Sequence, residues 1–553
     1  MSNLTNFMAI SNAIRSTNIH AIFRSIPSNF GAVDAGILFG SSAILYILIR
    51  RFSDRRSTPL KGPPTTFGNF LFGVLPFLRN VPDVGAVYEG WASRYGAVFS
   101  VPGLLGSRTI CLTDVKAIAH FSAEETYGYV GTPPAKRFNE KLLGRGLFWA
   151  EGDSHKRQRR ALNPAFSNVA IKNMTSIFFD SAYKAKAAWD AMLESSGPSE
   201  GIILEVQLWM NHISLDTIGL AGFSHDFGTL SGNTSNIASI FDAIGSKESV
   251  LDTVVFLLSL IVPIVDNVPT VRHSLLNQLT KAMQDLGNGF LETTDANADK
   301  SVIGFLMKSV SSEKISHEEV MSQIMFLIVA GYETTAISLT WALIELSRNP
   351  AIQTKLRDEL LRSGDPTWEE LTSHGSLLDA FTCEVLRMHP PLPEIERMAA
   401  KDDCLPLSTP IQTARGELVD TVFVRKGQYA KLSVECINRS EALWGPDAKV
   451  FNPGRWLDES NGVDQQRAQE LQGYRHLLTF SDGPRICLGK VFALTEFKTV
   501  LSVLLRNFVF EFPNGPDTAI GRRMGLLPRP GVEGEAGYDV PLRIRHYVPT
   551  ELA

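Results

Sequence analysis

The sequence predicts a mainly α fold with a minor β region, preceded by one N-terminal transmembrane helix. Helical periodicity dominates from about residue 83 to 389, and short strand-like segments joined by turns fill 405–434. Helical periodicity returns after Gly489, and an apolar segment at 31–49 precedes all of these elements. Much helix with a small sheet, and no internal repeat, indicates one large domain after the membrane segment.

Composition excludes several classes of protein. Of the 553 residues, 44% are hydrophobic and 20% are charged, and the formal net charge of −5 gives no sign of a nucleic-acid-binding surface. The cysteines are scattered without close pairs, at Cys111, Cys383, Cys404, Cys436 and Cys487. This spacing is not that of a disulfide framework or a zinc site.

The segment 31–49, GAVDAGILFGSSAILYILI, has the length of a membrane span. Nineteen helical residues cover roughly 28 Å, about the thickness of a bilayer core. A cleaved signal peptide is the rival interpretation, but the run is long and lacks a clear small-x-small cleavage site. Basic residues follow the span at Arg50, Arg51, Arg55, Arg56 and Lys61. The positive-inside tendency therefore places the bulk of the chain in the cytosol.

This topology divides the chain into four parts. We expect a short lumenal tail at 1–30, a transmembrane anchor at 31–49, a basic and proline-rich linker at 50–64 and one large domain at 65–553. The N-x-S/T sequon at Asn3 lies in the lumenal tail and is the expected glycosylation site. The expected location is the endoplasmic reticulum membrane, crossed once, with the large domain in the cytosol.

The longest helix that the sequence predicts lies between Ser316 and Pro350. Ser316 and Glu319 match a capping box, and Pro350 marks the end. About 32 helical residues measure roughly 48 Å, and a helix so apolar on all sides is expected to run through the interior. Its centre, AGYETT at 330–335, nevertheless carries a carboxylate and two hydroxyls. Because buried polar groups cost free energy unless they are satisfied, this segment is a candidate functional site.

A second candidate site is the loop FSDGPRICLG, which surrounds Cys487 with glycines and a proline and places Arg485 two residues before the thiol. A glycine-rich turn that leads into a helix offers backbone N–H groups and a favourable dipole end to a thiolate. Such a loop suits a thiolate bound to iron, which also needs shielding from water. For a lone cysteine a buried small side chain is the favoured alternative, but the ten-residue pattern argues against it.

This loop resembles the haem-binding signature of the cytochrome P450 family. The signature, Phe-x-x-Gly-x-Arg-x-Cys-x-Gly, is matched at Phe480, Gly483, Arg485, Cys487 and Gly489. The resemblance covers five ordered motifs from about Lys61 to Tyr547 and implies the cytochrome P450 fold, with a haem-thiolate catalytic domain at 65–553. It further implies that Cys487 is the axial thiolate on the iron of haem b. Phe480, Arg485 and Gly489 are then residues that bind the cofactor.

Two further segments resemble the structural triad of that family. EVLR, Glu384 to Arg387, puts an acid and a base on one helical face, and FNPGRW supplies Arg455 as the third member. Alone, the pair of Glu384 and Arg387 would be a surface contact of little value. Gly454 stands where glutamate is frequent, a departure that weakens a local charge contact and leaves the triad intact.

The remaining resemblances concern proton delivery and the haem propionates. AGYETT resembles the family's oxygen-activation motif, which implies Glu333 and Thr334 as the acid and alcohol that deliver protons. A core helix that merely contains these residues is the alternative. His155 takes the position usually held by tryptophan, Arg159 lies four residues on, and Arg397 follows a proline-rich bend. The resemblance implies that these three contact the propionates.

The implied function is a monooxygenase that inserts one oxygen atom from O₂ into a lipophilic small molecule. Electrons would come from NADPH through a separate NADPH–cytochrome P450 reductase. Taken singly, Lys156, Arg157 and Arg160 are typical of a solvated helix surface, whereas together they could receive an acidic electron donor. The apolar run 253–265 favours a pocket or a membrane-contacting surface. The segment HKRQRRALNPAF resembles fungal microsomal members that tailor secondary metabolites, often terpenoids.

Other functions stay open beside this one. They are a fatty-acid or xenobiotic hydroxylase, a haem-thiolate isomerase or dehydratase, and a non-enzymatic haem sensor. The pair of Glu333 and Thr334 argues against the isomerase, which needs no external electrons, and against the sensor, which needs no proton relay.

Overall fold

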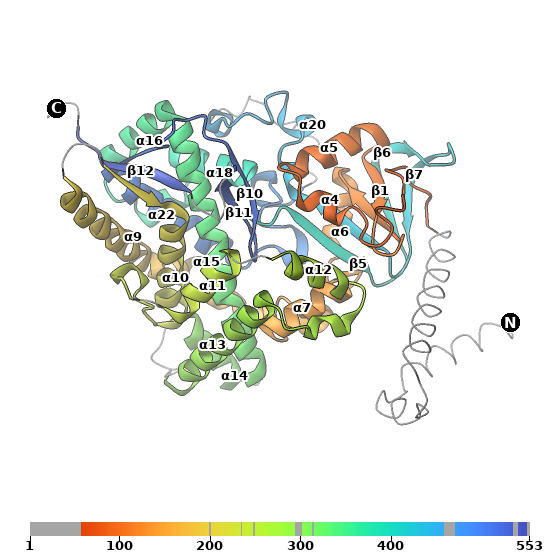
Figure 1. Cartoon of the computed structure of the whole chain (residues 1–553), viewed down its shortest axis with the longest axis horizontal. Helices are drawn as coiled ribbons and strands as arrows, with labels where there is room; N and C mark the ends of the chain where they lie inside the picture. Colours follow the sequence, from red (N-terminus) through yellow and green to blue (C-terminus); the bar gives the residue numbers. More distant parts are fainter. Residues whose placement is uncertain are drawn as a thin grey trace. The chain divides into compact units, whose positions relative to one another are not determined.

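The described residues form the body of the chain. The computed structural model describes residues 57–197, 201–233, 235–246, 249–293, 301–311, 315–457, 471–534 and 540–549. The expected lumenal tail with Asn3, the expected transmembrane anchor and residues 50–56 of the linker therefore lie outside the described residues. Within the described ranges a mainly helical fold with minor strands is confirmed, and Figure 1 shows its arrangement.

The helical elements follow one another along the whole described chain. The α-helices are α4 (Leu75–Arg79), α5 (Val84–Tyr95), α6 (Val115–Ala123), α7 (Pro133–Leu143), α8 (Gly152–Leu162), α9 (Asn168–Ser196), α10 (Val206–Phe223), α11 (Asn236–Ser246), α12 (Val250–Ser259), α13 (Val271–Thr293), α14 (Val302–Ser311), α15 (His317–Arg348), α16 (Pro350–Ser363), α17 (Trp368–Thr372), α18 (Leu377–Met388), α19 (Val434–Asn438), α20 (Glu441–Trp444) and α22 (Lys490–Asn507). Short 3-10 turns are η1 (Asn163–Phe166), η2 (Thr229–Ser231), η3 (Pro263–Asn267), η4 (Pro453–Trp456), η5 (Tyr474–His476) and η6 (Gly483–Arg485).

The strands make small sheets at the edges of the helical body. They are β1 (Val98–Pro102), β2 (Arg108–Leu112), β3 (Tyr129–Val130), β4 (Ile202–Glu205), β5 (Glu394–Ala399), β6 (Asp403–Gln412), β7 (Leu418–Val424), β8 (Tyr429–Ser433), β9 (Phe508–Glu511), β10 (Ile520–Met524), β11 (Pro528–Val532) and β12 (Pro541–His546). The largest sheet has the order β1-β2-β8-β5-β3, in which β2 and β8 are parallel and the other pairs antiparallel. β8 lies in the segment 405–434, which the sequence predicts to be rich in strands, and β5 lies shortly before that segment.

Helix α15 is the central helix that the sequence predicts. The capping box of Ser316 and Glu319 is present, and α15 ends directly before Pro350. Among the described helices, α15 is the one long and apolar enough to cross a membrane, but 72% of its most apolar window is buried in the protein. Figure 1 shows it running through the helical part beside α10 and α22. It is therefore a core helix.

Close packing of α10 on α15 requires a glycine at the centre of α15. A Cβ on Gly331 would lie 2.8 Å from Cγ1 of Ile218, which belongs to α10. Contacts this short do not occur between real carbon atoms, so a larger residue at this position requires the Ile218 side chain or α10 to shift. Gly331 thus lets α10 cover the polar segment 330–335.

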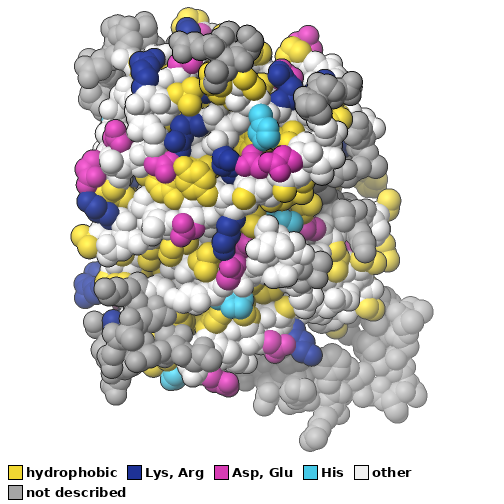
Figure 2. Space-filling view, turned by 90° about the vertical axis from the view of Figure 1, so that its left-hand side faces the viewer, with side chains coloured by type: hydrophobic (Ala, Val, Ile, Leu, Met, Phe, Trp, Pro, Cys, Tyr) yellow, Lys and Arg dark blue, Asp and Glu magenta, His cyan; other side chains and the backbone are white. Residues whose placement is uncertain are grey.

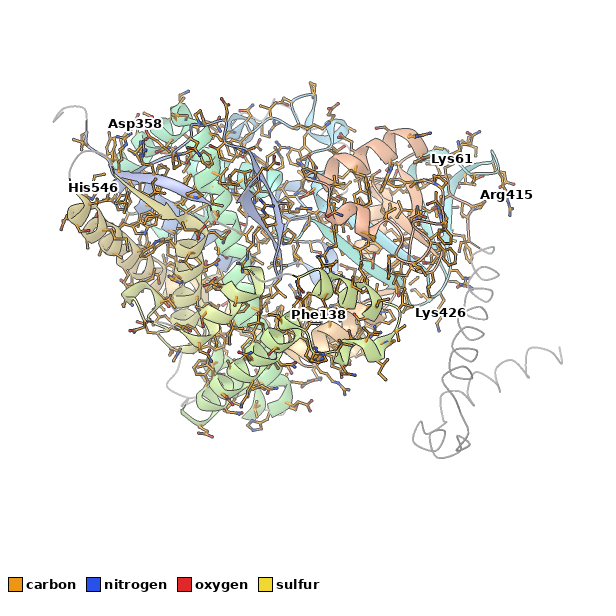
Figure 3. All side chains as sticks on the ribbon, in the orientation of Figure 1. Lys61, Phe138, Asp358, Arg415, Lys426 and His546 are labelled. Carbon is orange, nitrogen blue, oxygen red and sulfur yellow. The ribbon has the colours of Figure 1, made fainter. Side chains whose placement is uncertain are left out.

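Residues at the start of the described chain pack onto the sheets. The Ser57 hydroxyl donates to Oε1 of Gln428 at 2.7 Å. The ammonium of Lys61 donates to Oε1 of Gln412 at 2.6 Å, beside the β6–β7 hairpin (Figure 3). The last residues of the expected linker are therefore held by hydrogen bonds to the folded domain.

The C-terminal strands bring distant parts of the chain onto the helical body. β12 pairs with both β4 and β9, and the β10–β11 hairpin packs against α15. This hairpin carries Arg529 to the centre of α15. On the face shown in Figure 2, acidic and basic side chains are interspersed.

Candidate functional site

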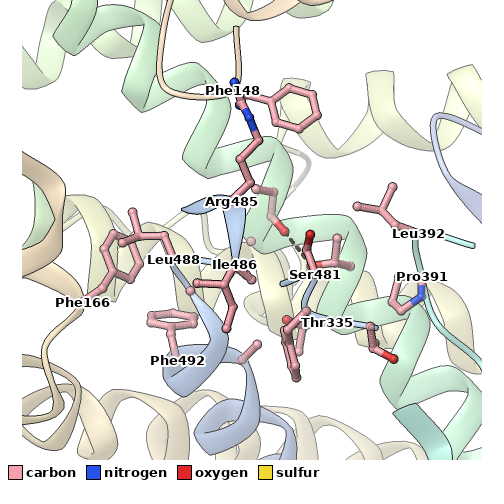
Figure 4. Close-up of a pocket in the computed structure, with 18 of the residues that line it drawn as sticks. Phe148, Phe166, Thr335, Pro391, Leu392, Ser481, Arg485, Ile486, Leu488 and Phe492 are labelled. Atoms are coloured by element: carbon pink, nitrogen blue, oxygen red, sulfur yellow. Dashed lines mark hydrogen bonds between the residues drawn. The ribbon is translucent and has the colours of Figure 1, made fainter. Parts of the chain in front are cut away.

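A cavity of about 290 Å³ lies between the centre of α15 and the loop that precedes α22. One side is formed by the cysteine loop and the start of α22, where Phe166, Leu488 and Phe492 lie together (Figure 4). The opposite side is apolar and includes Phe148 and Leu392. Both candidate sites that the sequence predicts, AGYETT and FSDGPRICLG, therefore contribute to one cavity.

The cysteine loop holds the thiol of Cys487 at the cavity. The backbone N–H of Cys487 donates to the carbonyl of Phe480 at 2.7 Å, which closes the loop. Gly483 has φ of +63°, and a Cβ there would lie 2.3 Å from the Ser122 carbonyl oxygen, so only glycine fits. Cys487 is partly exposed, and it lines the cavity.

The Cys487 thiol is shielded from solvent, and nearby donors and cations partly offset the cost of burying a negative sulfur there. Burial raises the pKa of Cys487, whereas the N–H of Gly489 and the positive charges of Arg159 and Lys490 lower it. The sulfur is thus placed where the loop donates to it and cations face it, as expected for a thiolate ligand.

Cationic side chains gather at the rim of the cavity. His155 and Arg159 of α8, Arg397 of β5 and Arg485 all line it. The guanidinium of Arg485 donates to the Ala150 carbonyl at 2.7 Å. The sequence predicts all four as cofactor-binding residues, and the fold brings them together from three separate segments.

One buried and one half-buried carboxylate pair with two of these arginines. Arg397 pairs with Glu125 at 2.8 Å, and Arg485 pairs with Glu151. Burial raises the pKa of Glu125, while Arg397 and then Arg485 lower it. Sequence reasoning missed both acids. Glu151 directly precedes α8, so its closeness to the predicted rim residues of α8 could have been inferred from the sequence. Nothing in the sequence connects Glu125 with Arg397.

His155 is neutral in this environment. It is 4% exposed, and burial together with Arg485, Arg159 and Arg397 lowers its pKa to about 4. A neutral imidazole carries one N–H donor, so it can donate a hydrogen bond as an indole does. The positive charge at the rim therefore comes from the arginines alone.

The predicted triad forms a fully buried network away from the cavity. Arg387 donates twice to the carboxylate of Glu384, at 2.8 Å each, and Nε of Arg455 lies 3.2 Å from the same carboxylate. Trp456 adds a fourth contact, with its indole N–H 2.9 Å from Oε2 of Glu384. Arg387 and Glu384 have no exposed surface, so the pair is not the weak surface contact that its spacing alone would suggest.

The acid and the alcohol of AGYETT point in different directions. Thr334 lines the cavity and donates to the Ala330 carbonyl at 2.7 Å. Glu333 is buried and pairs with Arg529, whose Nε lies 2.8 Å from Oε1 of the carboxylate. Burial raises the pKa of Glu333, and Arg529 lowers it. Successive residues of a helix are about 100° apart, which separates the two side chains. Sequence reasoning gave no sign of Arg529.

These residues fit the haem that the sequence pattern implies. Cys487 offers one sulfur donor to the cavity, and the arginines offer guanidinium groups to the two propionates of a porphyrin. The buried Nε of Arg485 makes no hydrogen bond to any residue that the structure describes, so it has donor capacity to spare. The donor set is thus that of a haem-thiolate site.

Comparison with known proteins agrees with the geometry. The family model of cytochrome P450 matches residues 63–532. Two cytochrome P450 monooxygenases of Ampulloclitocybe clavipes, claQ and claP, are 52% and 51% identical to the chain; the alignments cover 91% and 94% of this chain and 96% and 99% of the relatives. A ganoderic acid synthetase of Ganoderma lucidum is 29% identical over 86% of this chain and 92% of its own. The chain therefore belongs to the cytochrome P450 family.

Proposed function

We propose that this chain is a haem-thiolate monooxygenase that inserts one oxygen atom from O₂ into a lipophilic small molecule in secondary-metabolite biosynthesis. The observation that carries the proposal is the cavity in which Cys487 faces the hydroxyl-bearing centre of α15. Membership of the family and the names of the fungal relatives, monooxygenases and a ganoderic acid synthetase, support a tailoring role. Terpenoid substrates are the finer part of the proposal.

Each residue of the site then has a role toward the cofactor. Cys487 would ligate the iron, while Phe480 and Gly489 shape the loop around the sulfur. Arg159, Arg397 and Arg485 would hold the propionates by charge, and neutral His155 by its N–H donor. When bound, haem supplies the oxygen chemistry, and the thiolate ligand tunes it.

The distal side of the cavity selects the substrate. Phe148 and Phe326 stack with ring centroids 5.4 Å apart and an angle of 11° between the planes. Leu392 and Ile395 continue this apolar wall. Because the described side chains on this wall carry no charge, burial of a charged substrate against it would cost free energy, and a neutral lipophilic molecule is favoured.

The polar residues at the centre of α15 would deliver protons to the cavity. Thr334 has its hydroxyl at the cavity, where it can hold a proton in hydrogen-bond reach of a bound molecule. Glu333 lies behind it in the pair with Arg529 and would serve as the acid of the relay. Glu333 does not line the cavity and points away from Thr334, so a proton from this acid would have to cross the separation between the two side chains.

Electrons from NADPH would arrive through a separate NADPH–cytochrome P450 reductase. On α8, Arg157 is engaged with Glu319, whereas Lys156 and Arg160 are exposed and would meet an acidic partner. These exposed charges lie on the same helix as Arg159, which faces the cavity, so the partner would dock close to the cofactor.

The domain would sit on the endoplasmic reticulum membrane. Helix α12 exposes Val250, Leu251, Val254, Phe256 and Leu258, and Arg79 at the end of α4 stacks on Phe256 at 5.6 Å. This apolar surface lies in and beside the run 253–265 and would rest on the bilayer. Together with a lumenal tail at 1–30, an anchor at 31–49, a linker at 50–64 and glycosylation at Asn3, it gives a single-pass protein with a cytosolic catalytic domain at 65–553.

Expression of the full chain with a reductase in a microsomal host tests the proposal. We expect NADPH- and O₂-dependent conversion of lipophilic candidates in untargeted product analysis, and a strongly red-shifted absorbance of the reduced CO complex. Cys487→Ser should abolish this absorbance, whereas Cys404→Ser, an exposed cysteine on β6 outside the cavity, should keep it. Product formation without NADPH would indicate an isomerase, and no product at all a sensor; either result contradicts the proposal.

A further inference from the structure

A buried acid behind the rim of the cavity, Glu125, is not used by the proposed function. Its side chain is 1% exposed, and it lies in the loop between α6 and β3. Nε of Arg397, a residue that lines the cavity, lies 2.8 Å from Oε1 of Glu125. Neither of these two atoms forms a well-aligned hydrogen bond to any residue that the structure describes. Glu125 is therefore held beside Arg397 by charge, and an acid buried in this way needs a reason.

The loop that carries Glu125 is held by its backbone and not by the carboxylate. The N–H of Thr126 donates to the carbonyl of Tyr129 at 3.0 Å, and the carbonyl of Thr126 accepts from the N–H of Gly152 at 3.0 Å. Thr126 has φ of +92°, a strained conformation for a β-branched residue. No backbone N–H of the described chain donates to the carboxylate of Glu125. The loop thus fixes Glu125, whereas Glu125 caps no part of the loop.

Glu151, the other acid of the rim, has a different environment. One of its oxygens accepts from the N–H of Gly131 at 2.8 Å, so its carboxylate also holds the backbone. Its side chain is 19% exposed, and water therefore screens part of its charge. The contacts of Glu125 are with charges alone, and its burial leaves that charge almost unscreened.

Arg397 has donors for two partners. Its Nη1 donates to the carbonyl of Glu396 at 3.0 Å, and its Nε lies beside Glu125. Its Nη2 makes no hydrogen bond within the described part of the chain, so it stays available to a propionate. Arg397 and then Arg485 favour the charged form of Glu125 against the effect of burial. The guanidinium is thus fixed on one side by an acid and free on the other.

We propose that Glu125 is a positioning residue that fixes the guanidinium of Arg397 at the rim and, by its own charge, lowers the reduction potential of the bound haem iron. This inference rests on the proposed haem-thiolate function. A negative charge that water does not screen opposes the arrival of an electron nearby. Removal of the charge should therefore make the iron easier to reduce.

Redox titration of the full-length holoprotein tests this charge without substrate or reductase. In Glu125→Gln we expect the ratio of reduced to oxidised iron at a fixed potential to rise by at least about threefold, or about 28 mV for a one-electron couple. Glu124→Gln is the matched control, because this neighbouring acid is 36% exposed and pairs with Lys401 at 2.8 Å. An unchanged ratio in Glu125→Gln, or an equal rise in the control, would overturn the proposal.

Glu125→Asp separates charge from position. It keeps the charge and shortens the side chain, so the ratio of reduced to oxidised iron should stay within about twofold of that of the unmodified protein. The propionate bending bands in the resonance Raman spectrum should shift in both Glu125→Gln and Glu125→Asp, because Arg397 loses its fixed partner in each. Unshifted bands in both variants would contradict the positioning role, and a ratio raised as much in Glu125→Asp as in Glu125→Gln would contradict the role of charge.

Haem content and the red-shifted CO absorbance are measured on every variant. If Glu125→Gln binds no haem, Glu125→Asp decides: haem bound at the potential of the unmodified protein supports the need for a charge, and no haem there either overturns the proposal. If the unmodified protein shows the CO absorbance while Glu125→Gln titrates in the same way, this inference is wrong and the monooxygenase function stands. If the absorbance is missing from the unmodified protein, the proposed function itself fails.

Discussion

The pair of Glu333 and Arg529 offers the most direct test of how α15 is stabilised. Oε1 of Glu333 accepts from Nε of Arg529 at 2.8 Å, both side chains are almost fully buried, and Oε2 of Glu333 has no further described partner. Arg529→Met keeps most of the side-chain volume and removes the cation. The variant therefore leaves one carboxylate in the core without its counter-charge.

The size of the effect follows from the protonation of Glu333. Instead of staying charged, the carboxyl can bind a proton, which for an ordinary glutamate pKa costs about 3.7 kcal/mol at pH 7 and about 1 kcal/mol at pH 5. The penalty at neutral pH thus falls within the roughly 3–5 kcal/mol measured when buried pairs lose one partner. In the variant the folded pKa of Glu333 lies above the unfolded one, so stability is present at low pH and is lost as pH rises.

Urea unfolding of the full chain at pH 5 and pH 7 measures this dependence. Relative to the unmodified protein, Arg529→Met should lose up to about 2.7 kcal/mol more at pH 7 than at pH 5. Adding Glu333→Gln should remove most of that difference. A small remainder is expected because Asp242 also feels the charge of Arg529. An equal loss at both pH values, or a double variant as pH-dependent as Arg529→Met, would refute the reasoning.

Three further predictions follow from single contacts. Arg387→Lys should cost about 3–5 kcal/mol in urea unfolding, since lysine cannot reproduce both hydrogen bonds to Glu384; a loss below about 1 kcal/mol would contradict this. The folded pKa of His155, about 4, lies below the unfolded one, so its contribution is lost as pH falls from about 6.5 to 4. In His155→Gln the melting temperature should therefore depend less on pH between about 6.5 and 4 than in the unmodified protein. An equal pH dependence of the melting temperature in both proteins would contradict this. Gly331→Ala should destabilise by about 1–3 kcal/mol, and Ile218→Ala should recover part of the loss by removing the atoms that clash; an additive loss would argue against the contact.

Features set by neighbours in the chain were predictable from the sequence. The capping box of Ser316 and Glu319 begins α15, and the proline at 350 follows its end, as predicted. The cysteine loop leads into α22 directly after Gly489. Such features depend on local backbone geometry, which residue types at fixed spacing determine. The gathering of Arg397 and Arg485 on one cavity was predictable only through the resemblance to a family.

Contacts between distant segments were not predictable. Arg529 lies 196 residues after Glu333 and reaches it because the β10–β11 hairpin packs on α15. Glu125 reaches Arg397 through the pairing of β3 and β5, a register that no residue pattern in the sequence specifies. Charged residues of this kind occur throughout the chain, and only tertiary structure selects which of them meet.

The centre of α15 explains why three consecutive polar residues can stand in an apolar helix. Glu333 is paired with Arg529 of β11, Thr334 donates to the carbonyl of Ala330 in its own helix, and Thr335 lines the cavity. A buried carboxylate in an apolar helix needs a cation from another element beside it, whereas a buried hydroxyl can be satisfied by the carbonyl one turn earlier in its own helix.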